Sequence, residues 1–94
     1  MFTGIIEATG KIVELTQKQG DLAIRIQSTN LDMKDVKLGD SIATNGVCLT
    51  VVAKHSDGFS ADLSNETISL TGFAHYKKGQ TVNLEKAMQP LSRL

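Results

Sequence analysis

The sequence predicts an all-β fold: a small antiparallel barrel or sandwich of about six short strands, with short helical segments between some of them. Along most of the 94 residues, apolar and polar side chains alternate with a period of two, which is typical of half-buried strands. Turn-forming pairs that contain glycine separate these runs, for example Gly20-Asp21 and Asp57-Gly58. A barrel is favoured over a sandwich because closure of the sheet removes its exposed edges.

The first strand is the longest and the least regular. The even-numbered positions from Ile6 to Ile12 share one phase of the alternation, whereas Val13 and Leu15 lie in the other. A change of phase within a strand predicts a β-bulge. Three regular strands follow in residues 21–28, 58–64 and 80–86, and the positions predicted to face the core are Leu22, Ile24, Ile26, Phe59, Ala61, Leu63, Val82 and Leu84.

An Asn-Gly pair lies in the middle of the run at residues 41–51. Asn-Gly between alternating residues is the strongest short-range signal of a β-hairpin, and it makes Asn45 and Gly46 the two loop residues. Directly opposed residues lie on the same side of a sheet, so each opposed pair belongs to one face. The predicted pairs are Thr44 with Val47, Ala43 with Cys48, Ile42 with Leu49, and Ser41 with Thr50.

This register places the only cysteine, Cys48, on the face away from the core, together with Ser41 and Thr50. Because a free cysteine is usually buried, an outward Cys48 predicts that something covers it. The residues alone leave two alternatives: a short helical segment of the chain packs over the thiol, or a ligand or partner does. Neither His55 nor His75 can be placed beside Cys48, so a cysteine–histidine nucleophile pair is not supported.

Two connecting stretches are each expected to form one or two helical turns. Residues 28–40 begin with three cap-type residues and contain apolar residues among polar ones. Residues 64–73 begin with Ser64 as a cap, place Glu66 where the helix dipole favours an anion, and meet Gly72 as a stop.

The charge balance and the single cysteine argue against several classes of function. Ten basic and ten acidic side chains cancel, so neither nucleic acid nor a membrane surface is an expected partner. Aromatic residues are sparse, which argues against a base-stacking platform. A single cysteine excludes an internal disulfide and a cysteine-rich metal site, and no metal is expected. The lack of a basic and apolar leader and of a membrane-spanning apolar run predicts a cytoplasmic protein.

Four stretches occur in an order and at a spacing that point to a known family: MFTGIIEATG at the start, NGVCLTVV near the middle, then DLSNETISLT and KKGQTVNLEKA. Through them the whole chain resembles the N-terminal barrel of riboflavin synthase of the α-subunit type. The resemblance implies a six-stranded antiparallel Greek-key barrel with one or two short helices. It also implies that residues 1–94 are one lumazine- or flavin-binding domain, the N-terminal half of an enzyme made of two such barrels in tandem.

The activity that the resemblance implies is a dismutation. Two molecules of 6,7-dimethyl-8-ribityllumazine give riboflavin and 5-amino-6-(D-ribitylamino)uracil. No cofactor is required, and the bound ligand is riboflavin or the lumazine. The isolated domain is expected to bind either ligand and to be nearly inactive, because the second barrel is missing. The alternative, from another functional class, is a non-catalytic lumazine protein that uses the bound ligand as a fluorophore.

The resemblance also implies the site residues and the assembly. Ser41 and Cys48 correspond to positions implicated in proton transfer or nucleophile handling, and Phe2 matches a phenylalanine of the assembled site. The ligand-binding positions are Gly4, Ile5, Ile6, Cys48, Leu49, Thr50, Asp62, Leu63, Ser64, Asn65, Glu66, Thr67 and Ile68. The family enzyme is expected to be a homotrimer. The isolated barrel is expected to form a homodimer, because a second copy offers a surface similar to that of the missing half.

Overall fold

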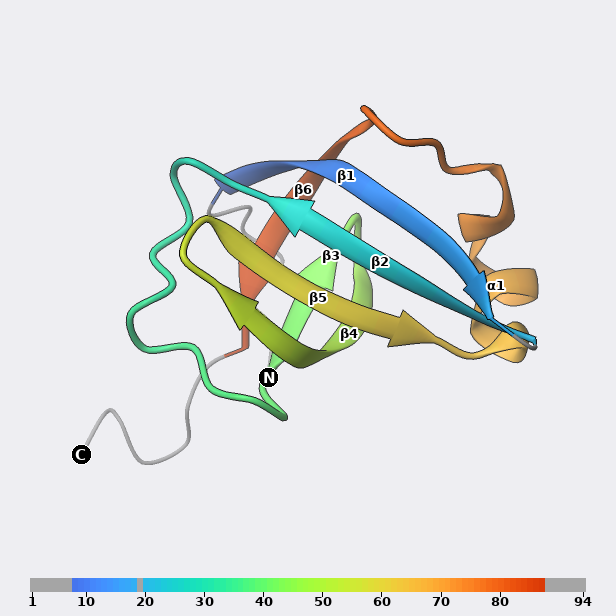
Figure 1. Cartoon of the computed structure of the whole chain (residues 1–94), viewed down its shortest axis with the longest axis horizontal. Helices are drawn as coiled ribbons and strands as arrows, with labels where there is room; N and C mark the ends of the chain where they lie inside the picture. The colour runs from blue at the N-terminus through green and yellow to red at the C-terminus, as the bar shows by residue number, and fades with distance from the viewer. Residues whose placement is uncertain (1–7, 19, 88–94) are drawn as a thin grey trace.

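The computed structural model describes residues 8–18 and 20–87, which form six strands, one α-helix and one 3-10 helix (Figure 1). The elements in chain order are β1 (Ala8–Lys18), β2 (Asp21–Gln27), β3 (Ser41–Thr44), β4 (Val47–His55), β5 (Gly58–Leu63), α1 (Asn65–Thr71), η1 (Phe73–His75) and β6 (Thr81–Lys86). The strands form a closed antiparallel barrel in the order β1-β2-β5-β4-β3-β6. The predicted all-β class and the predicted barrel are confirmed.

Three hairpins and two longer connections produce this strand order. Tight turns join β1 to β2, β3 to β4 and β4 to β5, whereas residues 28–40 and 64–80 lie at opposite ends of the barrel (Figure 1). Because β2 lies beside β5, the four strands from β2 to β5 have the Greek-key arrangement that the resemblance implies. The barrel closes where β1 pairs with β6, with Ala8 opposite Leu84.

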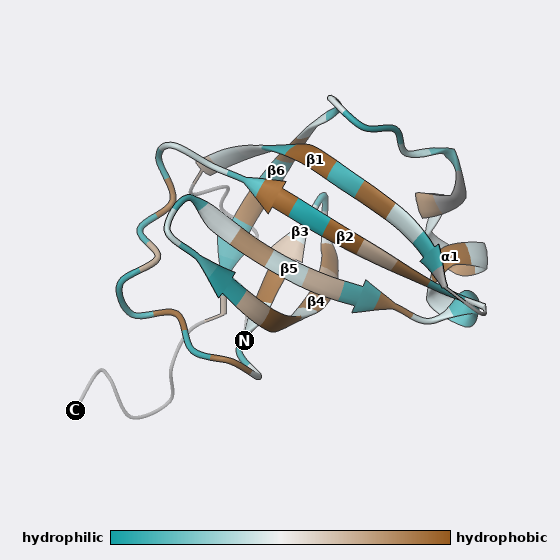
Figure 2. Ribbon diagram, viewed as in Figure 1, coloured by the Kyte–Doolittle hydropathy of each residue, from teal (hydrophilic) through white to brown (hydrophobic). Residues whose placement is uncertain are grey.

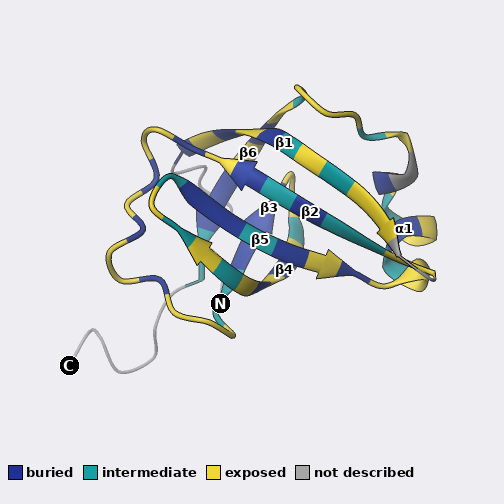
Figure 3. Cartoon of the chain, viewed as in Figure 1, coloured by how far each residue is buried: buried dark blue, intermediate teal, exposed yellow. Residues whose placement is uncertain are grey.

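The interior of the barrel is filled by aliphatic side chains together with Phe59 and Phe73. Hydrophobic residues and buried residues form alternating bands along the strands that largely coincide (Figures 2 and 3). The predicted core positions in β2, β5 and β6 are buried, except that Leu22 is half-buried and packs against the core. The alternation with a period of two therefore decides which side chains fill the barrel.

Two β-bulges interrupt the regular pairing. The register of β1 against β2 shifts between Ile12 and Glu14, where the change of phase in the sequence predicts a bulge. A second shift lies between Val51 and Ala53 of β4, and no change of phase marks it in the sequence. A bulge increases the local twist and bends the strand that carries it. The curvature of β4 in Figure 1 agrees with this.

The two long connections adopt different structures, although both are predicted to contain helical turns. Residues 64–72 form the predicted helix α1, with its serine cap and its glycine stop. Residues 28–40 form bends and turns, so the helical turns predicted there are wrong. Their buried apolar residues are Leu31, Met33 and Val36, two and three positions apart. This spacing cannot put all three side chains on one face of a helix.

Candidate ligand-binding site

The β3–β4 hairpin carries the outward polar row that the sequence predicts. Asn45 and Gly46 have φ angles of 49° and 82°, and a type I′ turn requires positive values at both positions. The register of the two strands is the predicted one. Cys48 and Thr50 are exposed, and Ser41 is half-buried opposite Thr50. The thiol and the two hydroxyl groups therefore lie on the outside of the barrel.

The exposure of Cys48 bears on the two alternatives that the residues leave open. The helix α1 packs against η1 and β2, and the Cys48 thiol is free and exposed. In the described part of the chain, no helical segment covers the thiol. A thiol on the barrel surface beside hydroxyl groups is available to a ligand or to a partner.

Strands β4 and β5 separate next to this polar row. Their pairing starts at His55 opposite Gly58 and extends only to Val51 opposite Ala61. Beyond that point residues 47–50 pair with β3 and residues 62–63 pair with β2. Among the described residues, neither stretch has a strand partner on its other side. We call the space between these two stretches the β4–β5 gap.

Main-chain groups of β4 point into this gap. In an antiparallel pair, alternate residues direct both their N–H and their C=O groups to the same neighbouring strand. The Val51 N–H donates to the Asp40 carbonyl oxygen at 2.9 Å, on the β3 side. Cys48 and Thr50 have the opposite parity, so their N–H and C=O groups point away from β3 and toward β5.

Main-chain groups of β5 point into the gap from the other side. The pair His55–Gly58 closes a tight turn, so Gly58 and every second residue after it direct their main-chain groups toward β4. By this parity, the gap receives both groups of Asp62. The N–H of Ser64 also points into the gap. The Ser64 carbonyl oxygen does not, because it accepts a hydrogen bond from the Ile68 N–H at 3.0 Å within α1. The β4–β5 gap is thus lined on both sides by main-chain donors and acceptors that no described strand pairs.

Residues 62–68 form a wall of this gap and add polar side chains to it. Ser64 caps α1: its Oγ accepts a hydrogen bond from the Thr67 N–H at 3.2 Å and donates one to Thr67 Oγ1 at 3.0 Å. Asp62 and Glu66 are exposed, as is the neighbouring asparagine at position 65. The predicted polar side chains of this segment therefore lie on the surface, where Asp62 and Ser64 border the gap.

Three of the predicted contact residues have side chains that belong to the barrel core. Leu49, Leu63 and Ile68 are 2%, 1% and 9% exposed and pack in the hydrophobic cluster. They can contact a ligand on the surface only through their main chain. The predicted contacts Gly4, Ile5 and Ile6, and the matching Phe2, lie outside the described residues.

A contact that the sequence does not predict joins the β3–β4 hairpin to Tyr76, the residue that follows η1. Asn45 Nδ2 donates to Tyr76 Oη at 3.0 Å, and the Asn83 N–H donates to Asn45 Oδ1 at 2.7 Å. The Tyr76 ring packs on Phe73, with 4.1 Å between the ring centroids. Asn45 belongs to the hairpin that carries Cys48, and η1 follows directly on α1. Hydrogen bonds between residues so far apart produce no periodic pattern in the sequence. The sequence shows only that Asn45 favours a turn.

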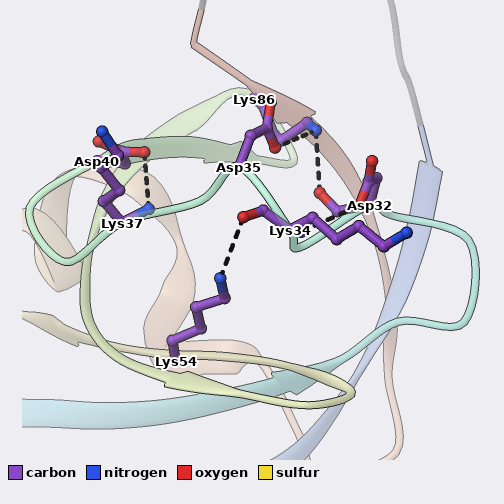
Figure 4. Close-up of polar contacts among 7 residues, drawn as sticks. All are labelled: Asp32, Lys34, Asp35, Lys37, Asp40, Lys54 and Lys86. Carbon is purple, nitrogen blue, oxygen red and sulfur yellow. Dashed lines mark hydrogen bonds and ion pairs between the residues drawn. The ribbon is translucent and has the colours of Figure 1, made fainter.

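One ion pair and several hydrogen bonds of charged residues lie at the other end of the barrel, where residues 28–40 meet the end of β6 (Figure 4). Lys86 Nζ donates to the Asp35 carboxylate and to the Asp32 carbonyl oxygen, both at 2.9 Å. The hydrogen bond from Lys86 holds the pKa of the Asp35 carboxyl group below its ordinary value. None of these residues belongs to the predicted site, although Lys86 pairs with Ile42 of β3, the neighbour of Ser41.

A polar hollow of about 250 Å³ lies elsewhere on the surface. It is lined by Thr9, Gly10, Lys11, Gln27, Ser28, Thr29 and Thr81, none of which is a predicted site residue. Within residues 8–18 and 20–87, no three metal-ligating side chains gather in a group that could hold a metal ion. In the same part of the chain, no helix is long and apolar enough to cross a membrane.

One known family matches most of the chain. Residues 3–87 match the model of the lumazine binding domain. The chain belongs to this family. Riboflavin synthase of Photobacterium phosphoreum is 57% identical to the lumazine-binding domain over 93 residues, and that of Bacillus subtilis strain 168 is 44% identical over 88 residues. These matches cover 99% and 94% of the domain but 43% and 40% of the two relatives. The lumazine-binding domain thus spans less than half the length of the curated relatives it matches.

Solved structures of LumP have the same fold as this lumazine-binding domain. LumP in complex with 6,7-dimethyl-8-(1'-D-ribityl) lumazine superposes with a TM-score of 0.84 at 28% identity, over 96% of the domain and 49% of LumP. The complex with riboflavin gives a TM-score of 0.83 at 29% identity, over 92% and 46%. The complex with flavin mononucleotide gives 0.83 at 27% identity, over 97% and 53%. The domain therefore has the fold of proteins whose crystal structures contain these ligands.

Proposed function

We propose that this lumazine-binding domain binds riboflavin or 6,7-dimethyl-8-ribityllumazine in the β4–β5 gap. The main support is the row of main-chain donors and acceptors that Cys48, Thr50 and Asp62 direct into the gap. The pyrimidine edge of a flavin or lumazine alternates carbonyl acceptors with a ring N–H donor. Such an edge can pair with the exposed main chain much as a further strand would.

The side chains around the gap suit the rest of the ligand. The hydroxyl groups of Thr50, Ser64 and Thr67 are neighbours of the main-chain row and can bond to the hydroxyl groups of a ribityl chain. Gly4 to Ile6 are proposed to complete the site from the N-terminal side. The two ligand classes share this pyrimidine edge and the ribityl chain, so one gap can accept both.

We further propose that the domain is the N-terminal half of a riboflavin synthase. In the full enzyme, two barrels would hold two lumazine rings face to face, and the reaction would be accelerated mainly by proximity and orientation. Ser41 and Cys48 would assist proton transfers from the outward row. Alone, the domain would turn over very slowly, because groups from the second barrel are missing. The lone cysteine, which has no disulfide partner in the chain, supports a cytoplasmic location.

A non-catalytic lumazine protein is the second candidate, supported by the structural match to LumP. The relative named riboflavin synthase is 57% identical, whereas the LumP structures are 27–29% identical, which favours the enzyme. For the isolated domain we propose a homodimer, because a second copy would offer a surface similar to that of a second barrel and two-fold pairing is the commonest closed assembly. Sedimentation should show a dimer, and a strict monomer at roughly tens of micromolar would contradict this assembly.

Quenching of riboflavin and lumazine fluorescence on titration tests the binding site. We expect saturable binding at about one ligand per chain, with Thr50→Val weakening it roughly three- to tenfold because one hydrogen bond to the ligand is lost. The matched control is Thr81→Val, an exposed threonine in a strand that lines the polar hollow instead of the gap. A loss of affinity confined to Thr81→Val would move the site to the hollow. No quenching at micromolar concentrations would contradict binding itself.

Cys48→Ser tests the outward thiol. Because Cys48 is exposed, we expect the variant to unfold at the same denaturant concentration as the wild type and to bind ligand with altered affinity. A large loss of stability with unchanged affinity would show instead that the thiol packs in the protein interior.

A further inference from the structure

The described walls of the β4–β5 gap carry negative charge and no positive charge. Asp62 is exposed on β5, and Glu66 is exposed in the first turn of α1. A third carboxylate, Glu85, lies opposite Ala43, which in turn lies opposite Cys48. Residues 41–53 and 55–76 contain no lysine or arginine. An anionic group in the gap therefore meets two exposed carboxylates and no compensating cation from these two segments.

The N-terminus of α1 does not offset this charge. A helix N-terminus attracts anions through its unpaired N–H groups and its dipole. Here Ser64 Oγ accepts the Thr67 N–H, and Glu66 already places a carboxylate in the first turn. The helix has only seven residues, so its dipole is small.

We propose that Asp62 and Glu66 determine the specificity of this site for an unphosphorylated ribityl chain. The inference rests on the proposed function, since it concerns the same gap. Riboflavin and the lumazine carry neutral ribityl chains, whereas flavin mononucleotide carries a terminal phosphate with a charge of nearly −2 at neutral pH. A LumP structure with flavin mononucleotide is known at 27% identity, so the fold itself does not exclude a phosphate. The carboxylates around the gap would instead disfavour the phosphorylated flavin.

The expected size of the effect follows from Coulomb's law. A dianionic phosphate at about 7 Å from one carboxylate in water loses roughly fivefold in affinity at about 10 mM salt, and roughly twofold at about 150 mM salt. Two carboxylates acting together multiply these factors. Riboflavin, which is neutral, should bind equally well at both salt concentrations.

The test compares the dissociation constants of riboflavin and flavin mononucleotide for the same protein at low and high salt. We expect the wild type to prefer riboflavin roughly tenfold or more at low salt, and Asp62→Asn and Glu66→Gln each to reduce this ratio roughly fivefold. Asp32→Asn is the matched control, since Asp32 is an exposed carboxylate in residues 28–40, at the opposite end of the barrel. It should leave the ratio unchanged.

The outcomes separate this inference from the proposed function. Equal affinity for both flavins in the wild type would overturn the charge-based specificity and leave ligand binding in place. A loss of riboflavin affinity in Asp62→Asn with an unchanged ratio would show that Asp62 acts by hydrogen bonding to the ligand, which also overturns it. Absence of binding of either flavin would overturn the proposed function itself.

Discussion

The two ends of the barrel are closed by connections that start alike and end differently. Ser28 Oγ accepts a hydrogen bond from the Leu31 N–H at 3.2 Å, and Ser64 Oγ accepts one from the Thr67 N–H at the same distance. Only the second serine is followed by a helix. A serine cap therefore permits a helix without specifying one, and the positions of the buried side chains that follow decide the outcome.

Both connections bury apolar side chains in the core, Leu31, Met33 and Val36 in one and Ile68 and Phe73 in the other, but their further contacts differ. Residues 28–40 are fastened to β6 by hydrogen bonds and an ion pair from Lys86, and Ser28 Oγ donates to the Thr9 carbonyl oxygen at 2.7 Å. Residues 64–76 are held by burial of Ile68 and Phe73 and by stacking of Tyr76 on Phe73. Residues 64–76 carry a wall of the proposed site, whereas residues 28–40, with their ion pair to β6, carry no predicted site residue.

Truncation of the buried Phe73 side chain should have the largest effect on stability and on flavin binding. Phe73 is 1% exposed, so Phe73→Ala should lower the free energy of unfolding by about 3–5 kcal/mol and weaken flavin binding, because α1 loses its support. Urea denaturation and flavin titration measure the two effects. Leu70→Ala on the same helix is the control, since Leu70 is 77% exposed and its loss should change stability by less than about 0.5 kcal/mol. Equal effects of the two substitutions would contradict the assignment of Phe73 to the core.

Substitution of the two capping serines compares the ends directly. Ser28 is buried and bonds to β1 as well as to its own turn, so Ser28→Ala should cost about 1–3 kcal/mol and leave flavin affinity unchanged. Ser64 is exposed, so Ser64→Ala should cost about 1 kcal/mol and weaken flavin binding. Thermal unfolding in the presence and absence of riboflavin gives both quantities. The reverse order of affinity changes would place the site at the other end of the barrel.

Acid should destabilise the connection at residues 28–40, with a smaller effect than the substitutions above. The hydrogen bond from Lys86 lowers the pKa of Asp35, and a hydrogen bond from Gln27 lowers the pKa of Asp57. A carboxyl group whose pKa is lower in the folded state stabilises the protein above its unfolded pKa of about 4, and that contribution is lost as the pH falls through the folded value. Asp35 is largely exposed, so the contribution of its carboxylate to the free energy of unfolding should be below about 1 kcal/mol.

Hydrogen exchange at pH 3 and pH 6 checks this expectation. Amide protection in residues 28–40 should fall on acidification, and Asp35→Asn should make the fall smaller. Protection that decreases first in α1 would show that the acid-sensitive contacts lie elsewhere.

The sequence predicts some of these features because they depend on local chemistry. Asn45 and Gly46 fix the register of β3 and β4, and the register fixes the outward direction of Cys48. Helix α1 is predicted correctly since a cap, an acidic first turn and a stop agree. The roles of Ser41 and Cys48 and the contacts of Gly4 to Ile6 remain predictions.

Features that depend on distant contacts are not visible in the sequence. The bulge at Val51–Ala53 breaks no alternation, so the separation of β4 from β5 cannot be read from the pattern. The Asn45–Tyr76 bond joins elements far apart in the chain. The helical prediction for residues 28–40 rests on the cap-type residues, whereas the spacing of the buried Leu31, Met33 and Val36 does not fit one face of a helix.

The pairing of the first strand with the last has a consequence for how such barrels can be linked. Ala8 at the start of β1 lies opposite Leu84 near the end of β6, so the chain enters and leaves the barrel at neighbouring points. A second barrel joined after β6 would displace no strand of the first, since β6 already has β1 and β3 as its two strand partners. Barrels of this kind can thus be concatenated as independent modules, and each can fold before the next has been synthesised.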